Sequence, residues 1–220
     1  MSSDNILDRM MASAKLSKKE TAKQQRILQS AIALFAEKGY ANTSTSEIAK
    51  RSGVAEGTIF RHYGTKENLL LAVIVPFLKE SLPVMAQEVF EEVHPEKQAG
   101  FEHFLRAMFL NRLRFFRENK EIFRVVVKEF VYRDELRNEL MPHINRDIVV
   151  YMFRAIDYFK AKGDLPELSN ERLLKLVFPF VFGRFVLRFV LASEEPPGSD
   201  EEEADFVVGF IMRGIGGLRS

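Results

Sequence analysis

The chain has 220 residues, of which 46% are apolar, and a formal net charge of +1. This apolar fraction excludes global disorder, and the length fits a small head and a larger body that share a core. The absence of Cys excludes disulfide frameworks, Cys-based zinc sites and cysteine nucleophiles, and suits a cytoplasmic protein.

Charge is distributed unevenly along the chain. Residues 1–67 carry 11 Lys/Arg against 7 Asp/Glu, a local net of +4, whereas residues 194–205 carry 7 acidic residues and no basic one. A positive end suits phosphates, although both stretches are also consistent with ordinary solvated faces. No secretory signal is visible in residues 1–25, and the charges of Lys175, Arg184 and Arg188 disfavour a membrane helix in the very apolar stretch 173–191. We therefore expect no membrane partner.

Apolar residues recur at helical spacing almost throughout the chain, which predicts an all-α protein. The segment before about residue 18 is polar and is expected to be frayed or to form a short helical arm. Pro76 and Pro83 are expected to bend or break the fourth predicted helix, Pro142 to break the seventh, and Pro196 and Pro197 to lie in a loop over 194–200. In chain order, helices are predicted over 24–38, two short stretches up to 63, 66 to about 93, 101–117, 120–132, 134–162, 168–192 and 201–218.

The most informative stretch is Thr43 to Lys66. Ser44 and Glu47 have the spacing of a capping box, which marks a helix start. The small residue Ala49, the turn former Gly53 and the apolar Ile59 then follow at the spacing of a helix-turn-helix unit, whose second helix enters the major groove of DNA. A helical hairpin with no DNA role is the alternative interpretation.

Several side chains of the second helix suit DNA. Thr58, Arg61 and His62 are expected to face outward and to donate to bases or phosphates, and Tyr63 to donate to a phosphate. Gly57 allows close approach of the backbone. Lys66 opens the next helix, where its charge and the free amides suit a phosphate.

Residues 24–70 resemble the N-terminal head of the TetR/AcrR family of transcriptional regulators. The matching features are the apolar set from Ile27 to Phe35, EKGY at 37–40, Thr43-Ser44, EIAKRSGVAEGTIFRHY at 47–63 and TKENLL at 65–70. The resemblance implies a homodimer that binds a palindromic operator, usually represses, and is released by an inducer in the body. Together, the helix-turn-helix motif and the family resemblance select the candidate DNA-binding residues, which are Ser44, Thr45, Glu56, Gly57, Thr58, Phe60, Arg61, His62, Tyr63 and Lys66.

Three positions depart from the family pattern. Ala55 and Glu56 stand where many members have Ser and Lys; Ala is a poor helix cap, and Glu56 cannot attract a phosphate. Glu56 either accepts a hydrogen bond from a cytosine amino group or simply favours the helix N-terminus. Phe60 stands where Tyr is common, so it lacks a hydroxyl but can still touch a thymine methyl.

The middle helices are rich in Phe, with 20 in the chain. A cavity lined by Phe and Met would take an apolar or amphipathic ligand, although plain core packing explains any single Phe. One of the Arg residues on these helices could anchor a carboxylate head group. No catalytic constellation, metal site or cofactor motif is present in the sequence, so we expect no enzyme and no cofactor. The candidate ligand-binding residues are Phe104, Met108, Phe109, Phe123, Phe130, Phe153 and Phe178.

The last two long helices are apolar on more than one side, which predicts a second partner beyond their own core. Paired between two subunits they would form a four-helix bundle. A monomer with a fully covered core is the alternative. The candidate interface residues are Val177, Phe180, Val181, Arg184, Leu187, Phe206, Phe210, Ile211 and Gly214.

These features predict a DNA-binding head over residues 1–66 and a ligand-binding and dimerisation body over 67–220. The expected partners are double-stranded DNA with a palindromic operator, a second copy of the chain and an apolar or amphipathic effector. An all-helical lipid-binding protein or enzyme without a DNA role is the competing hypothesis. Activation in place of repression also remains open.

Overall fold

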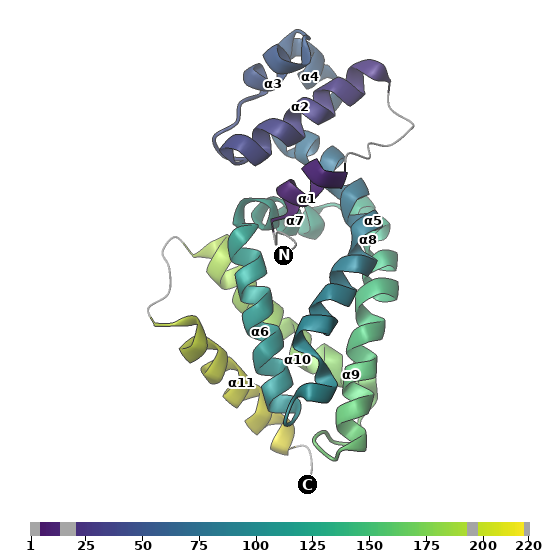
Figure 1. Cartoon of the computed structure of the whole chain (residues 1–220), viewed down its shortest axis with the longest axis vertical. Helices are drawn as coiled ribbons and strands as arrows, with labels where there is room; N and C mark the ends of the chain where they lie inside the picture. The colour runs from purple at the N-terminus through teal and green to yellow at the C-terminus, as the bar shows by residue number, and fades with distance from the viewer. Residues whose placement is uncertain (1–4, 14–20, 193–197, 218–220) are drawn as a thin grey trace. The chain divides into compact units, whose positions relative to one another are not determined.

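The computed structural model describes residues 5–13, 21–192 and 198–217, and every regular element in these ranges is a helix or a helical turn (Figure 1). The predicted all-α class, with an N-terminal helix-turn-helix and a larger helical body, is confirmed. The chain divides into two compact units: unit 1 comprises residues 1–80 and 118–133, and unit 2 comprises residues 81–117 and 134–220. The functional boundary expected after residue 66 stays a prediction.

Unit 1 is built around α2, whose start and end follow from the sequence. Thr21 and Gln24 form a capping box at its N-terminus, and Gly39 ends it with a positive φ of 81°. Its apolar face, including Ile27, Ala31 and Phe35, is fully buried. The helices of unit 1 are α1 (Ile6–Ser13), α2 (Ala22–Lys38), α3 (Thr45–Ser52), α4 (Glu56–Tyr63), the first part of α5 (Lys66–Val93) and α7 (Lys120–Tyr132).

The N-terminal segment contributes to the core of unit 1. Of the two expectations for it, residues 6–13 form the short helix, and Ile6, Leu7 and Met10 are buried. The amide of Ile6 donates a buried hydrogen bond of 2.7 Å to Oδ1 of Asn119, just before α7. This bond pairs one of the amides that a helix start leaves unpaired. Residues 14–18 of the predicted arm lie outside the described residues.

Helix α5 runs without a break from Lys66 to Val93, so the expectation that Pro76 or Pro83 breaks this helix is wrong. Buried apolar side chains along it hold the helix in place where the two missing amides weaken it. By length and composition alone the stretch Lys66–Lys97 is apolar enough to cross a membrane. A core helix passes the same test, and fully buried Leu69, Leu70 and Ile74 belong to the core of unit 1.

Unit 2 has an aromatic core. Phe104 packs with its ring centroid 5.3 Å from that of Phe159, and Phe109 stacks on Phe185 at 5.0 Å. These four side chains join three helices and are buried. The elements of unit 2 are the rest of α5, a short turn at Pro95–Lys97, α6 (Phe101–Glu118, as far as residue 117), α8 (Asp134–Ile144), α9 (Val150–Ala161), α10 (Asn170–Val186) and α11 (Asp200–Gly216).

Pro142 does not break the chain into two helices as expected. It lies inside α8, and a single π-helical turn, Asn145–Val149, leads directly into α9. A π-helical turn inserts one extra residue and thereby absorbs a local disturbance of the hydrogen-bond ladder. A second such turn, Leu187–Leu191, extends α10. Of the loop predicted over 194–200, residues 194–197 lie outside the described residues.

Ion pairs join α10 to α11 within unit 2. The guanidinium of Arg188 pairs with the carboxylates of Glu203 and Asp200, and Arg184 reaches Glu203 at 2.8 Å. Arg188 and Glu203 are nearly buried, so each depends on the other to offset its desolvation. The acidic first turn of α11, expected at a helix N-terminus, therefore also holds the last two helices together.

Candidate nucleic-acid interface

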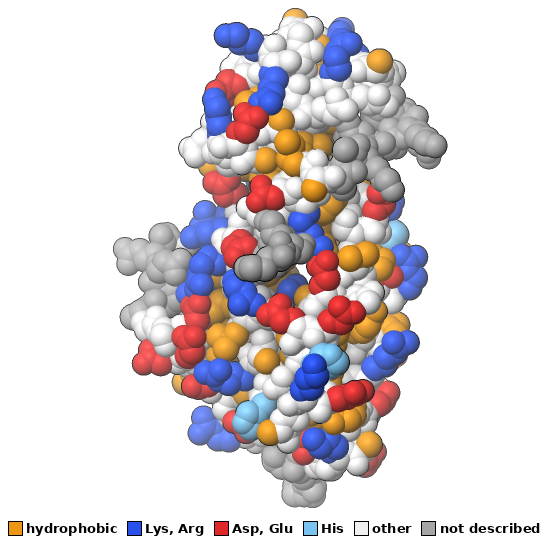
Figure 2. Space-filling view, viewed as in Figure 1, with side chains coloured by type: hydrophobic (Ala, Val, Ile, Leu, Met, Phe, Trp, Pro, Cys, Tyr) orange, Lys and Arg blue, Asp and Glu red, His pale blue; other side chains and the backbone are white. Residues whose placement is uncertain are grey.

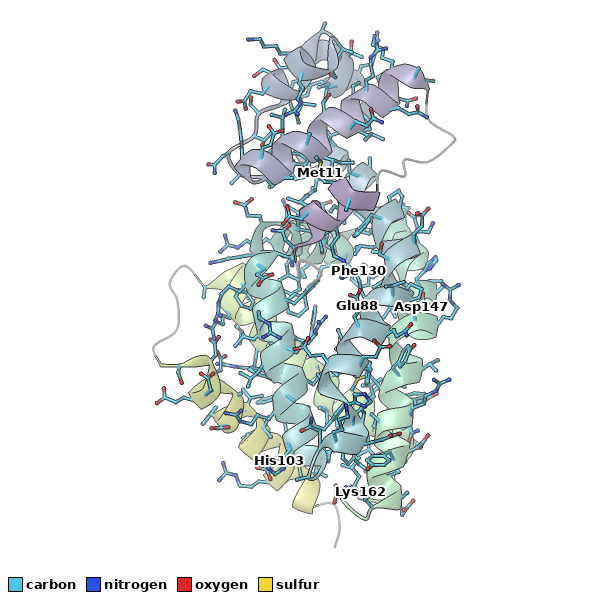
Figure 3. The ribbon with its side chains drawn as sticks, viewed as in Figure 1. Met11, Glu88, His103, Phe130, Asp147 and Lys162 are labelled. Atoms are coloured by element: carbon cyan, nitrogen blue, oxygen red, sulfur yellow. The ribbon has the colours of Figure 1, made fainter. Side chains whose placement is uncertain are left out.

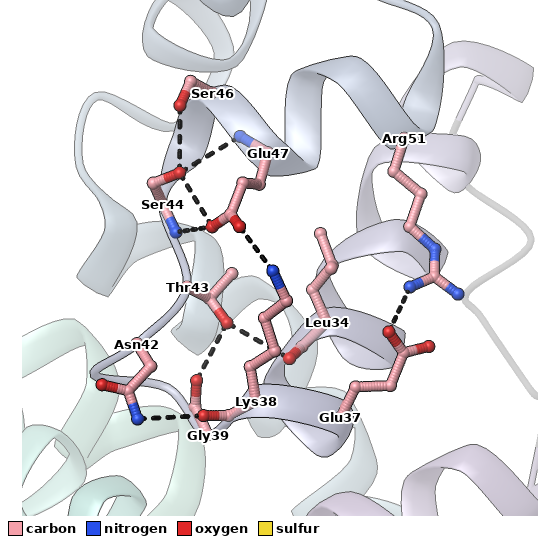
Figure 4. Close-up of polar contacts among 10 residues, drawn as sticks. All are labelled: Leu34, Glu37, Lys38, Gly39, Asn42, Thr43, Ser44, Ser46, Glu47 and Arg51. Atoms are coloured by element: carbon pink, nitrogen blue, oxygen red, sulfur yellow. Dashed lines mark hydrogen bonds and ion pairs between the residues drawn. The ribbon is translucent and has the colours of Figure 1, made fainter.

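The start of α3 is fixed by a reciprocal capping box, as the sequence predicts (Figure 4). Oγ of Ser44 accepts from the amide of Glu47 at 3.2 Å, and the Glu47 carboxylate accepts from the amide of Ser44 at 2.9 Å. The ammonium of Lys38 lies 2.6 Å from the same carboxylate. Lys38 and then the Ser44 bonds lower the pKa of Glu47 to about 2. The hydroxyl of Ser44, a candidate DNA contact, is therefore already engaged within the head.

The turn between α3 and α4 depends on one glycine. Gly53 takes the left-handed conformation, with φ 68° and ψ 39°, and the amide of Val54 donates to the carbonyl of Ala49 at 3.0 Å. This closes α3 in the manner of a glycine C-cap and redirects the chain into α4. The structure thus contains the helix-turn-helix unit predicted from the spacing of Ala49, Gly53 and Ile59.

Helix α4 begins without a side-chain cap, because Ala55 has no group to accept from the first amides. A different contact secures this end: the hydroxyl of Thr45 donates to Oε1 of Glu56 at 2.6 Å. It links the first residue of α3 to the first residue of α4. Sequence reasoning selected both residues as DNA contacts but did not predict their bond, because eleven residues and a turn separate them.

The exposed side of α4 is narrower than predicted. Gly57, Arg61 and His62 are exposed, and Phe60 is 49% exposed. Thr58, however, is only 8% exposed and lies on the inward side with Ile59, so the expectation that Thr58 faces outward is wrong. Positions 58 and 59 lie about 100° apart around the helix axis, so the buried side of this short helix is wide enough to include both.

The side chain of Lys66 forms hydrogen bonds within the head. Its ammonium donates to the carbonyls of Tyr40 and Thr43 at 2.9 and 3.0 Å, and lies 4.3 Å from the centre of the Tyr40 ring. These bonds hold the loop between α2 and α3 against the start of α5. The phosphate contact expected of Lys66 stays a prediction, and its observed partners are the protein's own carbonyls.

Tyr40 lies at the centre of the same region. Its side chain is buried, and its ring packs against Phe35. Burial, followed by the nearby carboxylates of Glu67, Glu121 and Glu129, raises the pKa of the Tyr40 phenol. The loop before α3 is therefore anchored on a neutral aromatic side chain.

Helix α7 supports both ends of the helix-turn-helix, which the sequence did not predict. Glu121 accepts from the amide of Ala41 at 3.0 Å, next to the start of α3. At its other end, Arg133 donates to Oδ1 of Asn68 at 2.7 Å, and Nδ2 of Asn68 donates to the carbonyl of Tyr63 at 2.7 Å. The contacts made by α7 join residues more than sixty positions apart, so no local pattern reveals them.

Ion pairs within the head engage some of its Lys and Arg side chains, so only part of them can bind a ligand. Lys38 pairs with Glu47 and Arg51 with Glu37, at 2.6 and 2.7 Å. Lys50 and Arg61 are exposed and form no ion pair with any residue in the described ranges. Figure 2 shows the resulting surface, on which basic and acidic side chains are interspersed. The exposed rim of α3 and α4 thus combines cations with an apolar side chain, as DNA-reading helices do.

Comparison with known proteins identifies this arrangement. Residues 27–73 match the model of the bacterial regulatory proteins of the tetR family. The chain is 24% identical to the uncharacterized HTH-type transcriptional regulator YvkB of Bacillus subtilis, over 87% of the chain and 96% of that protein. It is 56% identical over 48 residues, 22% of the chain, to the HTH-type transcriptional repressor Rv3405c of Mycobacterium tuberculosis, where the match covers 26% of that protein.

The head of the chain, residues 27–73, is that of the TetR family of bacterial regulatory proteins. The chain is a DNA-binding transcriptional regulator and, like these relatives, not an enzyme. The fold extends over the body as well: the transcriptional regulator FadR of Bacillus subtilis, solved in complex with stearoyl-CoA, superposes with a TM-score of 0.56 at 18% identity, over 86% of this chain and 98% of that one.

The predicted effector-binding residues are divided between the two units. Phe104 and Phe109 are buried in the core of unit 2, together with half-buried Met108 and Phe153. Phe123 and Phe130 belong to α7 in unit 1, where Figure 3 labels Phe130. Phe178 is 54% exposed and stacks on Phe182 of its own helix. Phe178 therefore resembles a surface residue more than a cavity lining.

The predicted dimerisation residues lie on α10, its π-helical extension and α11. Phe206 is 66% exposed, and Phe210 and Leu187 are also exposed. Phe180 stacks on Phe210 with centroids 4.9 Å apart, and Ile211 is buried within the subunit. Gly214 is exposed, and Val177, Val181 and Arg184 are half-buried. The two helices thus share one inner face and leave a large apolar face uncovered.

Proposed function

We propose that this TetR-family regulator binds a palindromic operator as a homodimer, represses transcription in the cytoplasm, and leaves DNA when a hydrophobic or amphipathic molecule binds its body. The observation that carries the proposal is the exposed side of α4, where Gly57, Phe60, Arg61 and His62 face outward on a helix supported at both ends. A recognition helix must present its side chains without rearranging, because ordering them on binding costs affinity.

The contacts divide by chemistry. Arg61 and His62 donate to base edges or phosphates, Phe60 touches thymine methyls, and Gly57 allows the backbone to approach. The amides of Thr45 and Ser46, in the first turn of α3, face phosphates. The exposed side of α4 is supported from within the head by Thr58, Tyr63 and Lys66. In this division residues 1–66 read DNA, and residues 67–220 bind the effector and form the dimer.

The uncovered apolar face of α10 and α11 supports the homodimer. Large side chains that are more than half exposed occur repeatedly there, and such a patch marks an interaction surface. Two copies related by a two-fold axis would bury this face and present two recognition helices to successive turns of the major groove. The large apolar side chains of these two helices and the π-helical turn that are more than half exposed are Leu176, Phe178, Leu187, Leu191, Phe206 and Phe210.

An amphipathic effector is supported by composition and by one relative. The body is rich in Phe, and the FadR protein of Bacillus subtilis, which shares the fold, was solved with stearoyl-CoA. The effector acts only if it binds the DNA-free arrangement more tightly than the DNA-bound one. Long-chain acyl-CoA is therefore the first class of effector to test.

The test is footprinting of the purified chain on the DNA upstream of its own gene, with and without long-chain acyl-CoA. We expect one protected palindrome, loss of protection with added salt, and release by an effective ligand. Arg61→Ala and His62→Ala should abolish protection while sedimentation shows an intact dimer. Phe206→Asp should instead yield monomers. Protection that persists in the Arg61 and His62 variants would contradict the assignment of α4 as the reading helix.

A further inference from the structure

Glu56 places a carboxylate on α4, the helix that enters the major groove in the proposed function. It is the first residue of α4, is half-buried, and forms no ion pair with any residue that the structure describes. The hydroxyl of Thr45 donates to its Oε1 at 2.6 Å. Phosphates repel a carboxylate that has no cation beside it. Such a carboxylate on a DNA-binding surface therefore lowers the affinity for DNA unless it also makes a favourable contact with the DNA.

The edges of the base pairs offer a carboxylate few partners. Guanine N7 and O6 and thymine O4 accept hydrogen bonds, and a carboxylate at neutral pH also only accepts. Adenine donates from N6, but its N7 acceptor lies beside that amine and repels a carboxylate. Cytosine donates from N4 without a neighbouring acceptor of its own in the major groove. The base class that suits Glu56 is therefore cytosine.

Thr45 prepares the carboxylate for this contact. A Glu side chain loses rotamer freedom when it is fixed, and the Thr45 bond fixes it before DNA arrives. The bond occupies one lone pair of Oε1 and leaves the other oxygen, Oε2, to accept from a base. It also uses the only hydroxyl proton of Thr45, so Thr45 cannot donate to a phosphate while it holds Glu56.

We infer that Glu56, positioned by Thr45, selects a cytosine at one site in each operator half by accepting a hydrogen bond from its N4 amine. The inference rests on the proposed function and adds the base that this residue reads. The alternative role of Glu56 is to stabilise the N-terminus of α4 through the helix dipole, with no effect on base choice.

The test is selection from double-stranded oligonucleotides with randomised half-sites, using the full-length dimer. The wild type should enrich a C·G pair at one symmetric position, and changing it to T·A should weaken binding about ten-fold, as expected for one base contact. Glu56→Gln should lose the cytosine preference and accept adenine, because an amide both donates and accepts. Thr45→Val should weaken the discrimination, and Thr45→Ser, which keeps the hydroxyl, should retain it.

A second measurement needs no protein variant. Replacing the selected cytosine by 2-pyrimidinone, which lacks the amine, should weaken wild-type binding as much as T·A does, whereas 5-methylcytosine should bind like cytosine. Equal binding of the 2-pyrimidinone and cytosine operators would overturn the inference, as would identical selections by the wild type and Glu56→Gln. If the wild type selects no sequence at all, the proposed function itself is wrong, which is a distinguishable result.

Discussion

Arg133, the residue that follows α7, donates to Oδ1 of Asn68, and the amide of the Asn68 side chain donates to the carbonyl of Tyr63 at the end of α4. This chain of two 2.7 Å bonds connects a helix far along the sequence to the recognition helix. The end of α4 is therefore held by side chains outside the predicted set of DNA contacts.

We first predict that Asn68→Ala weakens operator binding although Asn68 is not among the predicted DNA contacts. Loss of the cap leaves the Tyr63 carbonyl unpaired and should lower the free energy of unfolding by about 1–2 kcal/mol. Isothermal titration with operator DNA and urea denaturation measure the two effects. Asn138→Ala, at an exposed position in unit 2, is the control. Unchanged operator affinity in Asn68→Ala would show that α4 needs no support at this end.

The two glycines of the helix-turn-helix should respond to alanine in opposite directions. Gly53 has a left-handed backbone and open space where an alanine methyl would lie, so Gly53→Ala costs only backbone strain, about 1–2 kcal/mol of stability. Gly57 lies inside α4 with open space as well, so Gly57→Ala should add about 0.5–1 kcal/mol. Thermal denaturation compares them. Gly57→Ala should nevertheless bind operator more weakly, because its methyl group faces DNA; stronger or equal binding would place Gly57 away from the groove.

We predict that ionisation of Tyr40 lowers the stability of the folded protein at high pH. The pKa of Tyr40 is raised in the folded protein, so the neutral phenol contributes stability that is complete below the unfolded value of about 10 and is lost as the pH rises above it. Tyr40→Phe cannot ionise and should lack this part of the decline in urea midpoint as the pH rises from about 9 to about 11. Tyr132→Phe, at an 80% exposed position, is the control. Parallel pH profiles for the wild type and Tyr40→Phe would exclude this role.

For Arg188 and Glu203, we predict that the effects of single substitutions on the free energy of unfolding do not add up in the double variant. Their side chains are 7% and 10% exposed, so Arg188→Met or Glu203→Leu alone leaves a charge nearly buried without its main partner and should cost about 3–5 kcal/mol. The double variant should recover most of that loss, because two apolar side chains fill the same space. A double-mutant cycle by urea denaturation measures the coupling energy. Arg114→Met, which breaks an exposed pair with Glu92, should cost less than about 1 kcal/mol.

Much of the fold was predictable because its signals are local. Helical periodicity with Gly39 and the Ser44–Glu47 capping box located α2 and α3, and the helix expected over 120–132 is α7 with the same bounds. The errors at Pro83 and Pro142 have a shared cause: surrounding packing kept both prolines within helical segments, and a sequence window contains no information about that packing.

The candidate site was predictable only in part. The turn and the exposed positions of α4 follow from spacing, but the inward side of Thr58 depends on how a two-turn helix meets α2 and α3. The carbonyl partners of Lys66 and the hydroxyl bond between Thr45 and Glu56 join residues that only the finished fold brings together. Local patterns identify the chemistry of a side chain, whereas its direction depends on the packing of the whole head.

The position of α7 in the sequence affects how the protein is made. Asn119, Glu121 and Arg133 complete the N-terminal helix, the loop before α3 and the end of α4, respectively. A ribosome must therefore synthesise 133 of the 220 residues before the DNA-reading end can be finished. Contacts of such long sequence separation slow folding. The nascent regulator should consequently acquire operator affinity only after more than half of the chain has been synthesised.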